Sequence, residues 1–167
     1  MQTDRPKIKI PLNAAEIIFE ILSIVIILAT ASLLFINYAE LPAKIPKHFN
    51  IGGVPDSWGA KSSLVSLFAV IIVFYVLLTI FGCFPHTFKH YLAIKENDTK
   101  YYYHNARMLI GALKTEIIAL FYYILWTSIQ VAKGNSQGLG IAYTLVFLIV
   151  IFGTLSFFIV RMIKKKG

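Results

Sequence analysis

The chain has 167 residues, of which 57% are hydrophobic, and it carries a formal net charge of +8 at pH 7. This apolar share exceeds the roughly 45–50% of ordinary soluble domains, so the composition argues against a soluble globular protein. The charge does not indicate nucleic-acid binding, because most basic residues flank apolar runs and no glycine-rich nucleotide-binding pattern occurs in the sequence. The single cysteine, Cys83, excludes an internal disulfide.

Four runs of mainly apolar residues follow, each with about the 20 residues that a helix needs to cross a hydrocarbon core of about 30 Å. Strands are excluded as spanning elements, because an open sheet in lipid leaves backbone groups unpaired. We therefore predict an all-α fold, an integral membrane four-helix bundle, with residues 1–167 forming one transmembrane domain. The predicted spans are residues 14–39, 63–84, 106–132 and 139–161.

The first span opens with the sequence PLNAAE. Asn13 can cap the helix, and Glu16 can return a bond to the cap, as in a capping box. Glu20 lies one turn further along the same face. The run is too long for a cleaved signal peptide and no small-residue cleavage pattern follows it, so we expect it to remain as a helix.

The connector between the first two spans, residues 40–63, carries more specific chemistry than a simple linker needs. Pro42 and Pro46 bar helix continuation and favour extended backbone before them. The pairs Gly52-Gly53 and Pro55-Asp56 are turn signals. We expect an ordered extracytoplasmic loop here.

The basic residues are divided unevenly between the two ends of the predicted spans. Four lie in the first and third connectors, Lys44, Lys47, Lys61 and Lys133. Eleven lie before the first span, between the second and third or at the start of the third, or at the end of the fourth or after it: Arg5, Lys7, Lys9, Lys89, Lys95, Lys100, Arg107, Arg161, Lys164, Lys165 and Lys166. The positive-inside rule then predicts a multi-pass plasma-membrane protein with N- and C-termini in the cytoplasm. We expect the basic tail to contact a lipid bilayer with anionic headgroups.

The second connector contains the sequence HTFKH, in which His86 and His90 share one face of a helix. The Glu that an HExxH metalloprotease needs is Thr87 here, so the general base of that mechanism is missing. We interpret the segment as a basic surface patch, and we predict no metal site and no cofactor.

The loop also carries a pattern that runs L-P-x-x-I-P-x-H-[FW]-N-x-x-G-x-x-D-x-[WY]-G-x-K. It resembles the signature of an uncharacterised bacterial and archaeal membrane-domain family, a domain that also forms the N-terminal part of SdpI-type toxin-immunity proteins. The start of the third span resembles the same family. Full SdpI-type proteins have further membrane segments with a second motif that this sequence does not show, so the resemblance implies the membrane fold more directly than immunity. The matching residues are Leu41, Pro42, Ile45, Pro46, His48, Phe49, Asn50, Gly53, Asp56, Trp58, Gly59, Lys61, Asn105, Arg107, Lys114 and Glu116.

Polar and aromatic residues of the loop form a candidate binding surface. One His and one Asp fall short of the three or four ligands of a zinc site. The usual role of Asx residues favours an ordered cap, in which they bind turn amides and Trp58 lies at the membrane interface. Such a cap can still be a recognition surface, because functional residues concentrate on rigidly held loops. The candidates are His48, Phe49, Asn50, Asp56, Trp58 and Lys61.

Five ionisable residues lie inside or at the edge of the spans: Glu16, Glu20, Arg107, Lys114 and Glu116. Charges at such depth are costly unless paired, so we expect them to face protein as intramembrane charge pairs. At 1.5 Å per residue, Glu20 and Lys114 lie at about the same depth of 9 Å. We predict that Glu20 pairs with Lys114 and that Glu16 lies near Arg107. These pairs serve either a proton or substrate pathway or helix registration, and registration is favoured.

We interpret the chain as a non-enzymatic binding module whose outer loop recognises a membrane-active peptide, a lipid or a partner membrane protein. The resemblance implies protection against such a peptide. One alternative is a small proton-coupled transporter acting as a dimer, although Glu20 is shallower than the midplane carboxylate of such exporters. Another is a membrane enzyme acting on lipid or cell-wall material, with His48 and Asp56 as acid and base but no evident nucleophile. The sequence is compatible with a homo-oligomer, and we expect no nucleic-acid partner.

Overall fold

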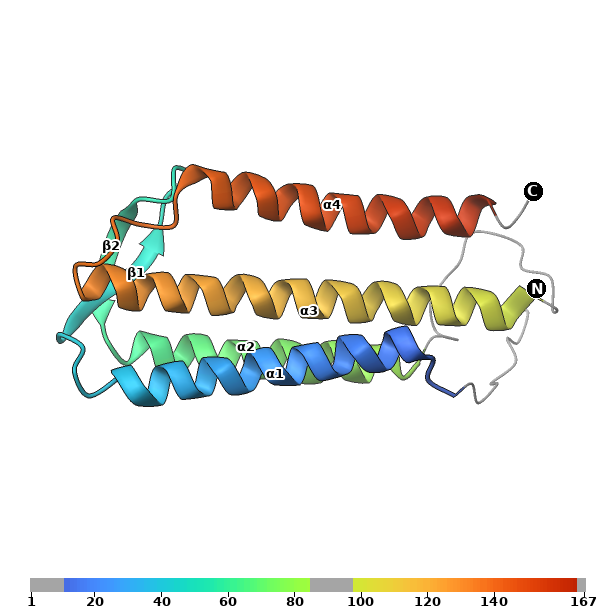
Figure 1. The fold of residues 1–167 in the computed structure, drawn as a ribbon, viewed down its shortest axis with the longest axis horizontal. Helices are drawn as coiled ribbons and strands as arrows, with labels where there is room; N and C mark the ends of the chain where they lie inside the picture. The colour runs from blue at the N-terminus through green and yellow to red at the C-terminus, as the bar shows by residue number, and fades with distance from the viewer. Residues whose placement is uncertain (1–10, 85–97, 165–167) are drawn as a thin grey trace, which may run out of the picture.

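The computed structural model describes residues 11–84 and 98–164, in which four long helices run side by side (Figure 1). They are α1 (Ala14–Asn37), α2 (Ser63–Gly82), α3 (Thr99–Ala132) and α4 (Ile141–Lys164). Two short strands, β1 (Lys44–Phe49) and β2 (Pro55–Ala60), lie across one end of the bundle, which we call the hairpin end. Helix α1 begins and α4 ends at the opposite end, which we call the far end.

All four helices are long and apolar enough to cross a membrane. Their bounds differ from the predicted spans most clearly in α3, which begins at Thr99 rather than near residue 106. The added turns contain Tyr102, Tyr103 and Asn105, whose side chains are buried against neighbouring helices. Hydropathy marks the part of a helix that suits hydrocarbon, and it does not register a polar extension beyond that part.

The predicted capping box at the start of α1 is confirmed. The backbone N–H of Glu16 donates to Asn13 Oδ1 at 2.9 Å, and the backbone N–H of Asn13 donates to Glu16 Oε2 at 2.7 Å. Two backbone donors that have no partner within the helix are thereby satisfied.

The fold is mostly helical, and the all-α prediction is wrong at the connector between α1 and α2. Strands β1 and β2 pair antiparallel, with a register that places Pro46 opposite Trp58 and His48 opposite Ser57. The register shifts on either side of His48, so the strand is bulged there. The pair Pro55-Asp56 begins β2 instead of forming a turn, whereas the turn lies around Gly53, whose φ is +77°.

Helix α3 is central to the packing, because it contacts α1, α2, α4 and β1. At the hairpin end the core consists of Leu41, Ile45, Leu64, Leu125 and Ile129, which fixes the hairpin on the helices. At the far end a smaller core joins α1, α3 and α4.

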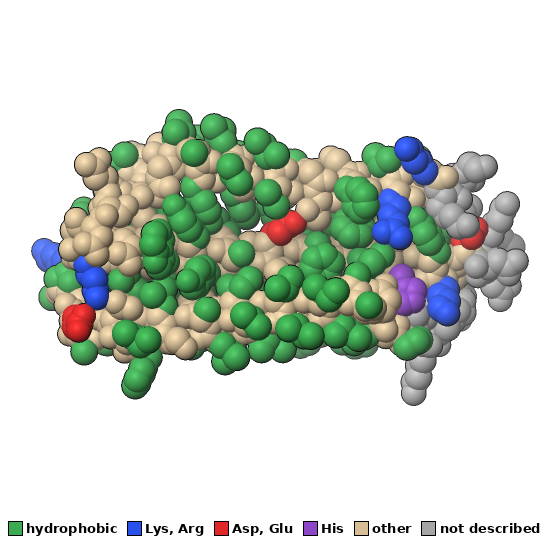
Figure 2. All heavy atoms as spheres, in the orientation of Figure 1, with side chains coloured by type: hydrophobic (Ala, Val, Ile, Leu, Met, Phe, Trp, Pro, Cys, Tyr) green, Lys and Arg blue, Asp and Glu red, His purple; other side chains and the backbone are tan. Residues whose placement is uncertain are grey.

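Large apolar side chains cover the outside of α1, α2 and α4. Figure 2 shows these side chains along the length of the molecule, while most charged groups gather at its two ends. This distribution suits a bundle surrounded by lipid, with its charged ends in contact with water and headgroups.

Candidate functional site

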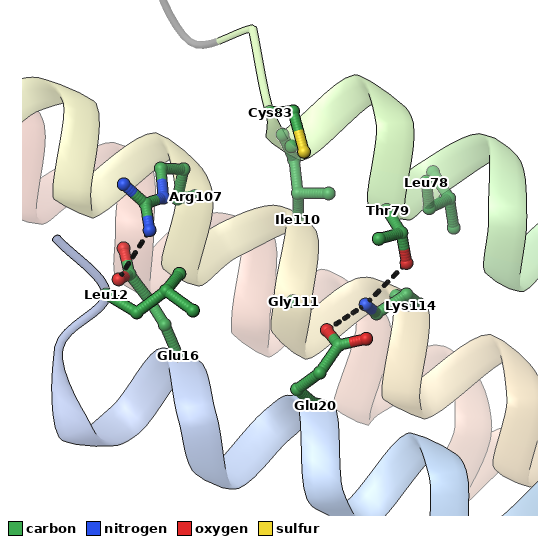
Figure 3. Close-up of a pocket in the computed structure, with 11 residues that line it drawn as sticks. Leu12, Glu16, Glu20, Leu78, Thr79, Cys83, Arg107, Ile110, Gly111 and Lys114 are labelled. Carbon is green, nitrogen blue, oxygen red and sulfur yellow. Dashed lines mark hydrogen bonds and ion pairs between the residues drawn. The ribbon is translucent and has the colours of Figure 1, made fainter. Parts of the chain in front are cut away.

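The acidic residues of α1 and the basic residues of α3 meet at the far end. Glu16 and Glu20 are one helical turn apart, and Arg107 and Lys114 are two turns apart on one side of α3. Since α1 packs against α3, both sets can face the same interface. The structure brings them together as Glu16 with Arg107 and Glu20 with Lys114, the pairing expected from their depths (Figure 3).

Glu16 has partners for both carboxylate oxygens. Arg107 Nη2 donates to Oε2 at 3.0 Å, and the backbone of Asn13 binds the same oxygen. Oε1 lies 3.1 Å from Nδ1 of His104, which in turn lies 3.2 Å from Asn13 Nδ2. This cluster ties the start of α1 to α3, and Glu16 is fully engaged by it.

Glu20 and Lys114 form the deeper pair, and α2 completes it. Lys114 Nζ donates to Glu20 Oε2 at 2.5 Å and to Thr79 Oγ1 at 2.9 Å. Its ammonium also lies 4.9 Å from the centre of the Tyr75 ring, while the Tyr75 hydroxyl donates to Glu20 Oε1 at 2.6 Å. Lys114 is only 3% exposed, so three helices share the burial of one ammonium group.

A cavity of about 410 Å³ lies beside these pairs, between α1, α2 and α3. Its polar lining consists of the four charged groups and Thr79, and the rest of the lining is mainly apolar, with Leu12, Leu78 and Ile110 among the residues (Figure 3). Because the charges are already neutralised as pairs, a ligand there would compete with existing bonds. The arrangement fits helix registration better than capture of a single charged ligand.

Glu116 is not part of any charge pair among the described residues, contrary to the prediction. Its Oε1 accepts a hydrogen bond from Thr154 Oγ1 of α4 at 2.5 Å. Its Oε2 is buried and has no hydrogen-bond partner within the described part of the chain. Glu116 lies on the face of α3 that contacts α4, whereas Arg107 and Lys114 lie on the face that contacts α1. Glu116 is therefore turned away from the two charge pairs.

The hairpin holds the second group of candidates. Its inner side is fixed by the buried Ile45 and by a hydrogen bond from the Leu139 backbone N–H to the Gly53 carbonyl at 2.8 Å. On the outer side, His48 Nδ1 lies 2.6 Å from Asp56 Oδ1, with the two side chains 66% and 41% exposed. The pair therefore lies in solvent on a rigid support.

The remaining predicted loop residues divide into two kinds. Asn50 Oδ1 accepts from the backbone N–H of Val54 at 3.1 Å, and Lys61 Nζ donates to the carbonyls of Tyr38 and Leu41 at 3.0 and 3.3 Å. Both are engaged in holding the hairpin. Trp58 is 53% exposed and Phe49 is partly buried.

Some contributing residues escaped the sequence interpretation. Tyr75 and Thr79 were counted as part of an apolar run, although their four-residue spacing places them on one face of α2. His104 and Thr154 were not assigned to any cluster. The HTFKH segment, with His86 and His90, lies outside the described residues.

The geometry defines a class of protein: a mostly helical chain with the four potential spans of a multi-pass membrane protein and a hairpin at one end. Residues 25–73 match a protein family described as a domain of unknown function, DUF1648. The match covers the second half of α1, the hairpin and the first half of α2, and it supports the likeness to an uncharacterised domain family. Comparison with curated proteins and with solved structures gave no significant match.

Proposed function

We propose that this chain is a plasma-membrane binding protein whose hairpin recognises a membrane-active peptide at the outer surface. The observation that carries the proposal is the hairpin itself. It is held from below by buried residues, and it presents the His48–Asp56 pair together with the exposed side chains of Ile51 and Trp58. Rigid display of apolar and charged groups beside a bilayer suits a ligand that is itself amphipathic.

The orientation rests on charge. In the sequence, eleven Lys and Arg residues lie before the first predicted span, around the start of the third or around the end of the fourth, and four lie in the other two connectors. The positive-inside rule therefore favours a hairpin outside the cell and both termini in the cytoplasm. A protease-accessibility assay on a tag inserted next to Ile51 tests this orientation; cleavage in intact cells is the expected result.

The likeness to the N-terminal domain of SdpI-type proteins supports immunity as the biological role of this recognition. In this role, the protein binds the peptide before the peptide inserts elsewhere in the bilayer. Catalysis is less well supported, because within the described residues no hydrogen bond joins the exposed His48–Asp56 pair to the hydroxyl of the neighbouring Ser57 or to another nucleophile. Proton-coupled transport through Glu20 is also less well supported, since Lys114 and Tyr75 already bind both of its carboxylate oxygens.

Site-specific photocrosslinking tests the proposal. A diazirine amino acid at Ile51, which is 87% exposed, is expected to capture a peptide in cells challenged with membrane-active peptides. The matched control is Phe35, an exposed apolar residue of α1 near the hairpin end, which is expected to capture lipid only.

A captured peptide must then bind the purified protein, and Trp58→Ala must weaken that binding while Phe35→Ala leaves it unchanged. Capture of lipid alone from both positions, or equal weakening by both substitutions, would contradict recognition by the hairpin.

A further inference from the structure

Glu116 lies deep in the region that lipid surrounds. It is ten residues beyond Ala106, the start of the apolar part of α3, which corresponds to about 15 Å along a helix. That depth is close to the middle of a hydrocarbon core of about 30 Å. An ionisable group in this position is expensive to maintain, so it indicates a functional site.

Helix α4 is fastened to α3 on both sides of Glu116. Toward the far end, Asn105 Nδ2 donates to the Phe158 carbonyl at 3.1 Å. Toward the hairpin end, the Tyr143 hydroxyl donates to the Leu120 carbonyl at 3.1 Å, and the Tyr143 ring stacks on Tyr123 with centroids 4.0 Å apart.

Between these two fastenings the helices pack loosely. Phe147, Ile151 and Thr154 follow one another on the α4 face toward α3, and each is only partly buried. Gly153, next to Thr154, lies on the exposed side of α4, where an added methyl group would meet no atom within 4 Å. Figure 2 shows a hollow between α3 and α4 near the middle of the molecule, with an acidic side chain in it.

The chemistry of the hollow is incomplete within the described residues. Glu116 has one oxygen bound to Thr154 and one buried oxygen that accepts no hydrogen bond. A buried polar atom without a partner is unfavourable, and most such atoms in proteins do have one. Because Oε2 has almost no accessible surface, a partner can bring a donor to it only if the side chains that cover this oxygen move aside.

We propose that Glu116 and Thr154 form an intramembrane binding site for the ammonium group of an amphiphilic amine. The ammonium N–H donates to Glu116 Oε2 once the side chains that cover this oxygen move aside, and the apolar body of the amine occupies the hollow between α3 and α4. A protonated amine supplies both the charge and the hydrogen bond that the oxygen lacks. A hard metal cation fits less well, because it needs about six oxygen ligands and the site offers one carboxylate and one hydroxyl. This site is separate from the hairpin and does not depend on peptide recognition.

Binding of a fluorescent amine to the full chain in lipid nanodiscs tests the site. The probe is monodansyl diaminooctane, a primary amine that is charged at pH 7, and its N-acetyl derivative is the uncharged control. We expect the amine to bind to the unaltered protein. Glu116→Gln is expected to raise the Kd of the amine about tenfold or more, because a charge-assisted hydrogen bond is lost. Glu40→Gln removes an exposed carboxylate outside the hollow and is expected to leave the Kd unchanged.

Equal binding of the amine and its acetyl derivative would overturn the proposal, as would unchanged amine binding by Glu116→Gln. If that variant does not fold, the unaltered protein still decides the question. Dicyclohexylcarbodiimide modifies carboxyl groups in apolar surroundings, and the amine, but not its acetyl derivative, is expected to slow modification of Glu116. Modification that is not slowed, or that falls with protein concentration because a second copy covers Glu116, would overturn the site.

Discussion

The Glu20–Lys114 pair allows a quantitative test of how the far end is held together. Lys114 is 3% exposed and Glu20 is 35% exposed, so the ammonium is the buried member of the pair. Glu20→Met leaves the ammonium with the Thr79 hydroxyl and the Tyr75 ring as its remaining partners among those described. Breaking a buried pair costs about 3–5 kcal/mol, and we expect the lower value of about 3 kcal/mol because Glu20 is partly accessible.

The reverse substitution is expected to be milder. Lys114→Met leaves the Glu20 carboxylate with the Tyr75 hydroxyl and with access to water or headgroups, so we expect a loss of about 1–2 kcal/mol. The double variant removes both charges from the membrane. It should lie within about 1 kcal/mol of the unaltered protein or be more stable, because replacing a buried pair by apolar side chains is often neutral or stabilising.

The measurement is the free energy of unfolding in mixed micelles, titrated with SDS and followed by far-UV circular dichroism. The exposed Lys133–Glu40 pair, with side chains 28% and 72% exposed, is the control, and Glu40→Met should cost less than about 1 kcal/mol. The reasoning is refuted if Glu20→Met is no worse than this control. It is also refuted if the two losses simply add in the double variant, because that would mean that the groups do not interact.

Three further outcomes follow from the geometry, each measured by the same titration. Gly138→Ala should lower the free energy of unfolding by about 1–3 kcal/mol, because φ is +155° and the new methyl group would meet the backbone of the hairpin turn. Gly153→Ala, at a helix position with open space around it, should leave the stability unchanged or raise it slightly. Equal effects of the two substitutions would contradict this reasoning. Asn13→Ala removes the capping box and should cost about 1 kcal/mol, with helix content falling at the start of α1; no change would mean that the cap contributes nothing. His48→Ala and Asp56→Ala should each change stability by less than about 1 kcal/mol, since the pair is solvent-exposed, and a larger loss would show that the pair holds the hairpin.

The helices and the two far-end pairs were accessible from the sequence for the same physical reason. A hydrocarbon core imposes a minimum apolar length, and helical periodicity then fixes which side chains share a face. Glu16 and Glu20 on α1 could therefore be matched by depth with Arg107 and Lys114 on α3. Tyr75 of α2 was missed because an aromatic side chain in an apolar run gives no sign that its hydroxyl is engaged.

The hairpin was not accessible in the same way. Its strands are six residues each, and the register shifts beside His48 disturb the alternation that identifies a strand. Pro55 and Asp56 favour turns locally, yet they form the start of β2. The contact between Gly53 and Leu139 supplies the constraint, and it joins segments more than 80 residues apart. Tertiary contact of this kind overrides local preference.

The last prediction is that Glu116 lowers the stability of the fold although it is required for binding of the amine. A residue present only to register helices should have both oxygens satisfied, as Glu16 does. Glu116 has one oxygen without a partner in the described structure, so Glu116→Leu should raise the free energy of unfolding by about 1–3 kcal/mol while abolishing binding of the amine probe. In this variant Thr154 can donate its hydroxyl hydrogen bond to a backbone carbonyl of its own helix, so the hydroxyl is not left without a partner. If Glu116→Leu instead lowers the free energy of unfolding by more than about 1 kcal/mol, Glu116 stabilises the fold, and stability and binding do not make opposite demands on this residue.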